Sequence, residues 1–379
     1  MSSKPNLSVF NISLASGGAE KVISLLLKEL KHDYNVHLIL MYNNVHFQIP
    51  KEVNVVFLTN KDTNRPFFAK ILDAFLFLLK YYKFLKINNI DYAVSFLPFP
   101  NLINGIVSIF NKKAVTIISE RGFPSDPTTS KSGLLISKLF YPLLYNKCSK
   151  LFSNSIHINK DLKDNFGIKI PMEVIYNPIE APIKTVASSS LNNKKTYLKV
   201  ITTGSLNSNK NQIMIFKAIE NSNNNLTVLG DGPLKKYLSN QIIELSLEKQ
   251  VCLKGRVQNV NEQLLKKDCF VLSSFSEGFP NALLEAMAIG LPCIATNCLS
   301  GPLELLNNNK PIKIDKGDFF TASFGILINV DDHIGLNKAL NYFNQNPSER
   351  EKYGKLALER SKNYLLKNVY NQFNHFLKN

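Results

Sequence analysis

The feature that constrains this chain most is the stretch at residues 273–292, which follows an apolar run, begins with a polar loop and ends on a helix-stop signal. The apolar run, Cys269–Leu272, predicts a buried strand. Asn281 is a good N-cap for a helix over residues 282–289, and Gly290 is typical of the residue that ends such a helix. This order predicts a binding loop that leads from a strand into a helix, as in α/β folds.

Two carboxylates accompany this loop. Glu277 lies in the loop itself, and Glu285 lies one turn into the predicted helix. The free N–H groups of the loop and the positive end of the helix would face the same cavity as both carboxylates. Carboxylates accept hydrogen bonds from sugar hydroxyls, whereas backbone donors favour anionic oxygens, so we expect a ligand with hydroxyls and phosphates. The alternative is a helix start whose acids merely complement the helix dipole.

Seven residues separate Glu277 from Glu285, and Gly-Phe-Pro follows the first glutamate. This pattern resembles the Glu-x7-Glu motif of the family-4 retaining glycosyltransferases, among them bacterial enzymes of lipid-linked glycan, O-antigen, lipopolysaccharide and capsule assembly. Their fold, GT-B, has two Rossmann-like domains with parallel sheets facing across a cleft. The resemblance implies that Glu277 faces the donor sugar and that Glu285 holds the ribose. It also implies donor contacts from the intervening loop, which consists of Gly278, Phe279, Pro280 and Asn281.

The length of 379 residues and the hydrophobic content of 45% are enough for two domains with sizeable cores. We expect an N-terminal Rossmann-like acceptor domain in residues 1–180 and a C-terminal Rossmann-like donor domain in residues 197–355. A serine-rich and Asn-Lys-rich tract at residues 181–196 predicts the linker. The resemblance implies that a terminal helix, residues 356–379, returns to the first domain.

Composition narrows the chemistry. The first residues lack a long apolar run, so we expect no secretory signal and a cytoplasmic location. The five cysteines lack CxxC or Cys/His ligand spacing, which favours reduced thiols over disulfides or zinc. The sequence contains no Asp-x-Asp triplet, the motif that holds Mg²⁺ in many sugar-nucleotide enzymes, so we expect catalysis without a metal or another cofactor.

The net charge of +16 includes a basic region at residues 61–163, with 15 Lys and Arg against 6 acids. Within it, residues 65–86 and 131–150 combine Phe, Leu and Tyr with flanking lysines and are too charged to span a bilayer. Such segments suit helices that lie on the anionic inner face of the cytoplasmic membrane. The alternative is ordinary Rossmann helices whose lysine stems cover one face. Lys80, Lys83 and Lys86 recur every third position and would bind either lipid or the acceptor's diphosphate.

Two loops of the first domain carry further candidates. Gly17 and Gly18 follow a predicted strand and precede a helix. Glycine at this position lets the backbone approach an anionic group. The alternative is a tight turn that binds no ligand. The loop resembles the family's acceptor-side and phosphate-side loop. Arg121 follows a strand at residues 115–118, in the region where many members carry a His that meets the donor sugar. It is a catalytic candidate, with pairing to Glu120 as the alternative.

The loop after the predicted strand at residues 198–203 resembles the family's Gly-Arg-Leu…Lys-Asn segment, in which Arg and Lys neutralise the donor diphosphate. Lys210 matches this pattern. Ser205 stands in place of the Arg, which removes a fixed positive charge next to the leaving group. Either Arg256 or Arg121 would compensate for that loss, or turnover would be slower. The resemblance also implies that the backbone near Arg256 and Val257 reads the nucleotide base.

The favoured function is retaining transfer of a hexose or N-acetylhexosamine from a nucleoside-diphosphate sugar, with UDP favoured, to a lipid-linked sugar acceptor. A sugar-nucleotide epimerase or hydrolase on the same fold is one alternative, and it would consume the donor without an acceptor. A non-catalytic basic, membrane-peripheral protein is the other. Neither an RNA-recognition aromatic pattern nor a basic recognition helix occurs, so we expect no nucleic-acid partner. Both alternatives leave Glu277 and Glu285 unexplained.

Overall fold

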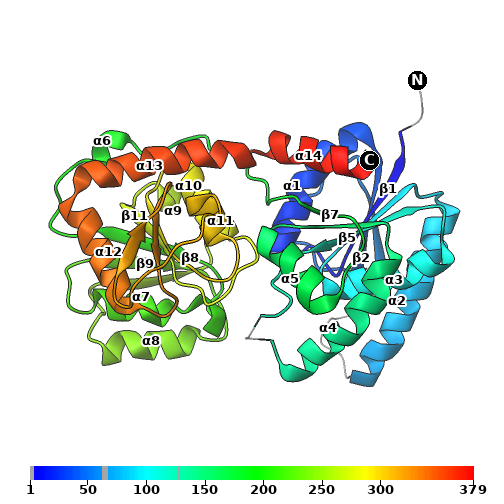
Figure 1. The fold of residues 1–379 in the computed structure, drawn as a ribbon, viewed down its shortest axis with the longest axis horizontal. Helices are drawn as coiled ribbons and strands as arrows, with labels where there is room; N and C mark the ends of the chain where they lie inside the picture. The colour runs from blue at the N-terminus through cyan, green and yellow to red at the C-terminus, as the bar shows by residue number, and fades with distance from the viewer. Residues whose placement is uncertain (1–3, 62–66, 127–128) are drawn as a thin grey trace. The chain divides into compact units, whose positions relative to one another are not determined.

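The computed structural model describes residues 4–61, 67–126 and 129–379, and the side chains of residues 67–71, 188 and 189 also lie outside the description. The chain divides into two compact units, one formed by Met1–Pro178 with Leu366–Asn379 and the other by Ile179–Leu365 (Figure 1). Each unit contains one seven-stranded sheet with packed helices. Both units are therefore Rossmann-like, as the sequence predicted.

The sheet of the first unit has the strand order β3-β2-β1-β4-β5-β6-β7, and every neighbouring pair is parallel. Its strands are β1 (Asn6–Asn11), β2 (Asn35–Tyr42), β3 (Asn54–Thr59), β4 (Tyr92–Phe96), β5 (Val115–Glu120), β6 (Lys150–Ser153) and β7 (Met172–Val174). Its helices are α1 (Gly18–Asp33), α2 (Phe67–Ile87), α3 (Pro98–Phe110), α4 (Lys131–Leu144), η1 (Tyr145–Lys147), α5 (Ile156–Phe166) and α14 (Leu366–Lys378).

The sheet of the second unit has the order β10-β9-β8-β11-β12-β14-β13, parallel except for the antiparallel edge strand β13. Its strands are β8 (Lys199–Thr203), β9 (Asn225–Leu229), β10 (Val251–Gly255), β11 (Cys269–Leu272), β12 (Cys293–Thr296), β13 (Phe319–Thr321) and β14 (Ile326–Ile328). Its helices are α6 (Ser188–Leu191), η2 (Ser208–Lys210), α7 (Gln212–Ile219), α8 (Lys235–Glu244), α9 (Val260–Leu264), α10 (Asn281–Ala288), α11 (Pro302–Asn307), α12 (His333–Gln345), α13 (Pro347–Ser361) and η3 (Lys362–Tyr364).

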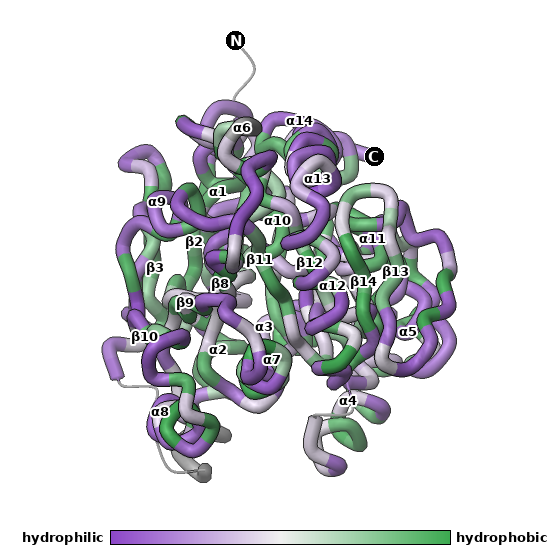
Figure 2. The backbone as a smooth tube through the Cα atoms, turned by 90° about the vertical axis from the view of Figure 1, so that its left-hand side faces the viewer, coloured by the Kyte–Doolittle hydropathy of each residue, from purple (hydrophilic) through white to green (hydrophobic). Residues whose placement is uncertain are grey.

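Strand β1 shows how an apolar run builds two faces of a core. Leu7 and Val9 pack with α1 and α14, whereas Phe10 packs with α2 and α3. On the α2 side, the ring of Phe10 stacks on Tyr81 at 4.1 Å, and the Tyr81 hydroxyl lies 3.1 Å from Ser8 Oγ. Alternate side chains of a strand point to opposite faces, so a sheet covered on both sides needs nearly continuous apolar strands. Figure 2 shows the strands as apolar stretches among mostly polar loops.

The C-terminal segment differs from the expected terminal helix at residues 356–379. Helix α13 ends at Ser361 and α14 begins at Leu366, so residues 356–361 belong to the second unit. The break has a backbone cause, because the N–H of Ile179 donates to Tyr364 O at 2.8 Å and Leu365 is extended, with φ −58° and ψ 142°. Helix α14 then packs on the first unit, where Tyr34 OH donates to Asn374 Oδ1 at 2.6 Å.

The predicted linker, residues 181–196, is packed against the second unit. Arg350 is fully buried and donates to three carbonyls, those of Leu191 (2.8 Å), Phe343 (2.6 Å) and Asn193 (2.5 Å). Two of these carbonyls lie in the linker segment, and the N–H of Val186 donates to Ile289 O at 2.8 Å. The polar composition of this segment concealed these anchors, which account for its order.

Candidate active site

Lys210 and Glu277 reach one another because the strands that precede them are neighbours. Strand β8 leads through η2 to Lys210, and β11 leads through a polar loop to Glu277. These strands pair in parallel, with Cys269 opposite Val200. Loops that leave adjacent parallel strands emerge at the same carboxyl edge of the sheet, which is where open α/β sheets bind ligands.

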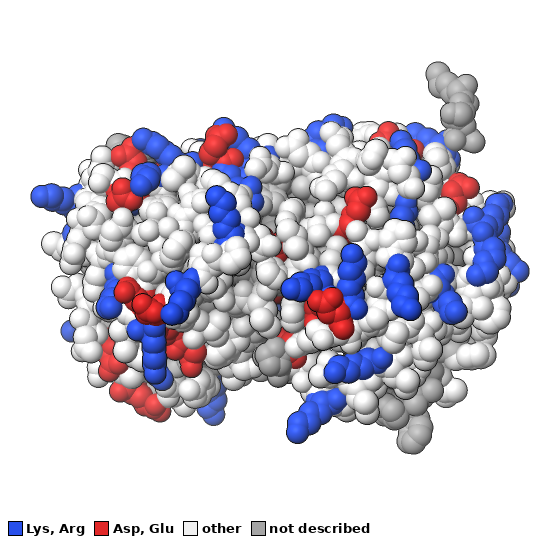
Figure 3. Space-filling model, in the orientation of Figure 1, with Lys and Arg blue, Asp and Glu red and all other residues white. Residues whose placement is uncertain are grey.

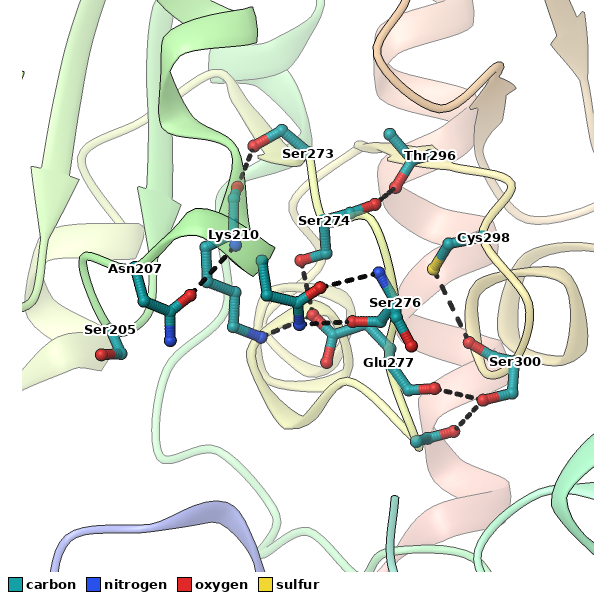
Figure 4. Close-up of polar contacts among 12 residues, drawn as sticks. Ser205, Asn207, Lys210, Ser273, Ser274, Ser276, Glu277, Thr296, Cys298 and Ser300 are labelled. Atoms are coloured by element: carbon teal, nitrogen blue, oxygen red, sulfur yellow. Dashed lines mark hydrogen bonds and ion pairs between the residues drawn. The ribbon is translucent and has the colours of Figure 1, made fainter. Parts of the chain in front are cut away.

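The two side chains form an ion pair, with 2.5 Å between Lys210 Nζ and Glu277 Oε1 (Figure 4). Ser274 Oγ donates to the same carboxylate oxygen at 2.6 Å. The Lys210 side chain is 24% exposed and that of Glu277 is 10% exposed. A shielded pair of this kind attracts more strongly than an exposed one and leaves the amine accessible to an anionic ligand.

Asn209 fastens the polar loop that carries Glu277. Its carbonyl accepts from the N–H of Phe275 at 2.8 Å, its Oδ1 accepts from the N–H of Ser276 at 3.0 Å, and its Nδ2 donates to Ser276 O at 2.8 Å. Ser273 Oγ adds a bond to Lys210 O at 2.7 Å. These four bonds join the two loops and fix the distance between the charged side chains.

The opposite side of the loop is held by the segment after β12. Ser300 Oγ donates to the carbonyls of Glu277 and Gly278, the latter at 3.0 Å. Because a trans peptide places its N–H opposite its C=O, the N–H groups of Gly278 and Phe279 are directed away from Ser300. Gly301 has φ +88°, and a Cβ at this residue would lie 2.4 Å from Pro280 Cδ, so only glycine allows this packing.

Helix α10 begins one residue earlier than expected, because Pro280 is its N-cap and Asn281 its first residue. Asn281 is therefore not the N-cap that the sequence predicted. Glu285 is the fifth of the eight residues of this helix, one turn from its start, and is half-buried. The helix start, with the positive end of its dipole, thus lies between the two glutamates in sequence.

Three other predicted donor residues lie at the same carboxyl edge. Ser205 follows β8 and is exposed, and its Oγ donates to Asp231 O at 3.4 Å. Gln212 Nε2 donates to the Ser205 carbonyl at 3.0 Å. Arg256 and Val257 follow β10, which β9 separates from β8. The structure therefore brings Lys210, Glu277 and Ser274 into contact and places Arg256 two strands away.

The remaining predicted site residues belong to the first unit. Gly17 is the N-cap of α1 and Gly18 its first residue. The Glu20 carboxylate folds back over this loop, since a Cβ at Gly17 would lie 2.1 Å from Glu20 Oε2. Burial raises the pKa of Glu20. The close approach that the glycine permits is therefore made by a side chain of the same helix.

Arg121 is buried at the carboxyl end of β5, with 8% of its surface exposed. Its Nη2 donates to Asn177 Oδ1 at 2.6 Å, and its guanidinium lies 5.8 Å from the ring centre of Phe96 and 5.9 Å from that of Phe152. Burial lowers the pKa of Arg121 to about 9 and raises that of Glu120 to about 7. These contacts favour a structural role for Arg121 over contact with a phosphate.

Lys80, Lys83 and Lys86 lie on α2 and are exposed. Lys80 Nζ donates to Leu58 O at 2.5 Å, and Lys86 Nζ lies 4.7 Å from the ring centre of Tyr82. Two of the three amines are thus already engaged. The predicted basic-aromatic segment at 65–86 begins outside the described residues, and Lys150, the end of the other segment, is buried in β6 and donates to Leu377 O at 3.2 Å.

Sequence reasoning missed the residues that position the charged pair, namely Asn209, Ser274 and Ser300. The available signal was the number of small polar side chains immediately before Lys210 and Glu277. Such residues carry short side chains that hydrogen-bond to nearby backbone and side chains, which is the chemistry that fixes loops.

Comparison with known proteins agrees with this geometry. The family model described as Glycosyltransferase Family 4 matches residues 16–181, and that described as Glycosyl transferases group 1 matches residues 184–360. An N-acetylgalactosamine-N,N'-diacetylbacillosaminyl-diphospho-undecaprenol 4-alpha-N-acetylgalactosaminyltransferase of Campylobacter jejuni is 31% identical over 362 residues, which cover 94% of each chain. A second enzyme of the same organism, a GalNAc-alpha-(1->4)-GalNAc-alpha-(1->3)-diNAcBac-PP-undecaprenol alpha-1,4-N-acetyl-D-galactosaminyltransferase, is 25% identical and also covers 94% of each chain.

Among solved structures, HepE of Anabaena in complex with UDP and glucose superposes with a TM-score of 0.75. The match covers 98% of this chain and 99% of HepE at 16% sequence identity, so it establishes the fold. The fold is GT-B, and the chain belongs to the family-4 glycosyltransferases.

Proposed function

We propose that this glycosyltransferase moves a hexose or N-acetylhexosamine from a UDP-sugar to a sugar on a lipid-diphosphate carrier, with retention of the anomeric configuration. The observation that carries the proposal is the ion pair of Lys210 and Glu277 at the carboxyl edge of the second sheet. The name of the Campylobacter jejuni relative supports the acceptor class and an N-acetylhexosamine as the first sugar to test. The UDP complex of HepE supports the nucleotide.

In this proposal, Lys210, the two glutamates, the start of α10 and the loop after β10 each have a role at the donor. Lys210 binds the diphosphate, Glu277 faces the sugar, and Glu285 holds the ribose hydroxyls. The backbone N–H groups at the start of α10 contact the phosphates, and the backbone around Arg256 and Val257 binds the base. The charges match the ligand, since an amine and backbone donors serve anionic oxygens while carboxylates accept from hydroxyls.

The reaction requires that negative charge be stabilised on the departing diphosphate. We infer that Lys210 and the start of α10 supply this stabilisation without a divalent cation. In a front-face displacement, the acceptor hydroxyl oxygen bonds to the anomeric carbon as the bond to the phosphate oxygen breaks. The hydroxyl proton passes to that phosphate oxygen, which balances the charge of the leaving group.

We also infer that the first unit docks on the anionic membrane leaflet that holds the acceptor. Helices α2 and α4 both pack beside α3 and carry large apolar side chains that are at least 41% exposed. On α2 these are Leu72, Phe75, Leu76, Leu79 and Ile87, and on α4 they are Leu135, Ile136, Leu139, Phe140 and Leu143. Apolar surface of this extent marks a partner or a membrane.

Charge favours the membrane as the occupant of this surface. Lys131 and Lys138 on α4 and Lys83 on α2 are exposed next to the apolar residues. In the face seen in Figure 3, Lys and Arg side chains are spread over the first unit. Apolar residues flanked by lysines suit the headgroup region of an anionic bilayer. In the part of the chain that the structure describes, no helix is long and apolar enough to cross a membrane.

A transfer assay tests the function. Purified protein is incubated with UDP-N-acetylgalactosamine, UDP-N-acetylglucosamine, UDP-galactose or UDP-glucose and with undecaprenyl-diphosphate-linked saccharides. We expect UDP release that depends on the acceptor, a mass gain of one sugar on the lipid, and an α-linkage by NMR. Equal donor consumption with and without acceptor would identify an epimerase or hydrolase and overturn the proposal.

A further inference from the structure

Ser274 is buried beside the ion pair of Lys210 and Glu277. Its Oγ donates to Glu277 Oε1 at 2.6 Å, the oxygen that also binds Lys210 Nζ at 2.5 Å (Figure 4). Ser274 has no exposed surface, and Thr296 Oγ1 donates to its carbonyl at 2.7 Å. The hydroxyl is therefore held against the carboxylate from a fixed backbone and out of competition with solvent.

The two donors to Glu277 differ in what else they can bind. Lys210 ends a flexible, partly exposed side chain, and it is the residue to which the proposed function assigns the diphosphate. Ser205 supplies no second positive charge at this edge. When a diphosphate with its two or more negative charges arrives, the amine is drawn from one carboxylate toward the stronger anion.

Withdrawal of Lys210 would leave the Glu277 carboxylate with fewer donors in a site where only 10% of its side chain is exposed. A buried carboxylate without donors is costly and turns toward any partner it finds. The sugar hydroxyls can be such partners only if the carboxylate keeps its orientation while the amine moves.

We propose that Ser274 is a positioning residue that keeps the Glu277 carboxylate aimed at the donor sugar while Lys210 turns to the diphosphate. This inference rests on the proposed function, because the exchange of Lys210 requires a diphosphate donor. Ser274 acts through Glu277 and touches neither the phosphates nor the reacting carbon.

A double-mutant cycle tests the inference. Ser274→Ala should lower kcat about tenfold and change the donor KM less than about twofold, since it removes one hydrogen bond to a charged group. In a Glu277→Ala background, where no carboxylate is left to hold, the same change should lower the residual rate less than about twofold. Radiolabelled donor makes the residual rate measurable. Ser274→Thr, which keeps the hydroxyl, should restore kcat where the variant folds.

Ser300→Ala is the matched control. It also removes a hydroxyl bonded to Glu277, but to the backbone carbonyl, so its effect should be the same in both backgrounds. Equal losses from Ser274→Ala in both backgrounds, or unchanged kcat in the otherwise wild-type protein, would overturn the inference while transfer itself continues. Absence of sugar transfer by wild-type protein with every donor would instead overturn the proposed function.

Discussion

Replacement of Leu135, Leu139 and Leu143 by Gln should release the protein from anionic membranes. The three residues recur every fourth position on α4 and are 70%, 56% and 55% exposed. Full burial of an exposed leucine side chain is worth about 1.5–3 kcal/mol, so the exposed parts of all three together are worth about 3–5 kcal/mol. Gln has a helix propensity close to that of Leu, and the changes lie on the solvent side, so the helix should persist.

A helix in the headgroup region buries only part of this area, so we expect the vesicle partition coefficient to fall about tenfold to a hundredfold. The assay is co-sedimentation with vesicles of phosphatidylglycerol and phosphatidylethanolamine. Wild-type binding should weaken with salt without vanishing, because screening removes only the contribution of the lysines. Ile243→Gln on α8, a residue 63% exposed in the second unit, is the matched control and should bind as wild type does.

A second variant distinguishes lipid binding from acceptor binding by the lysines of α2. Lys80, Lys83 and Lys86 changed to Gln should release the protein from anionic vesicles if these amines serve the membrane. The same changes should spare sedimentation and raise the acceptor KM if the amines bind the acceptor's diphosphate. Wild-type sedimentation by the α4 triple variant would refute insertion of α4. Failure of the unaltered protein to bind anionic vesicles at low salt would refute membrane docking altogether.

Three further outcomes are expected. EDTA should leave most of the activity, because Lys210 and the start of α10 supply the charge, and a loss above about 90% that Mg²⁺ or Mn²⁺ restores would contradict this. Glu285→Gln should mainly raise the donor KM, and Glu277→Gln should mainly lower kcat, because each change weakens a charged hydrogen bond worth about 1.5–3 kcal/mol of binding free energy. Wild-type kinetics in both variants would assign the loop a structural role. Burial raises the pKa of Glu120 from 4.5 to about 7, so the folded protein holds a proton that the unfolded chain releases. The free energy of unfolding in urea should therefore fall as the pH rises from about 4.5 to about 7. Glu120→Gln should make this pH dependence weaker.

The fold was largely predictable because parallel strands that are covered on both faces consist of short apolar runs in the sequence. The run at Cys269–Leu272 coincides with β11, and the loop that follows was assigned from its polar residues and turn signals. Helix α3 was not predicted; Pro98 and Pro100 lie in its first turn and Gly105 in its middle, and these residue types also punctuate loops. The break after Ser361 also escaped prediction, because it depends on a backbone bond from Ile179, a residue far away in sequence.

For the candidate site, the sequence identifies charged residues in motifs, but the burial and contacts of each side chain become visible only in the structure. Lys210 and Glu277 were each assigned from a separate motif, and the structure adds that their side chains form an ion pair. Arg121 is of a residue type that often binds anions, but its guanidinium lies against two aromatic rings and Asn177. Only tertiary packing distinguishes a guanidinium that faces a ligand from one that supports a strand end.

The return of α14 to the first unit sets an order for folding during synthesis. Phe373, Phe376 and Leu377 are buried in the core of the first unit, and the Phe373 and Phe376 rings contact that of Phe152. A ribosome makes these residues only after the whole second unit. The first unit of the nascent chain therefore keeps an apolar face uncovered until α14 is made. The second unit is continuous in sequence, so it can fold to completion before then. The part of the protein that is begun first is thus the part that is finished last.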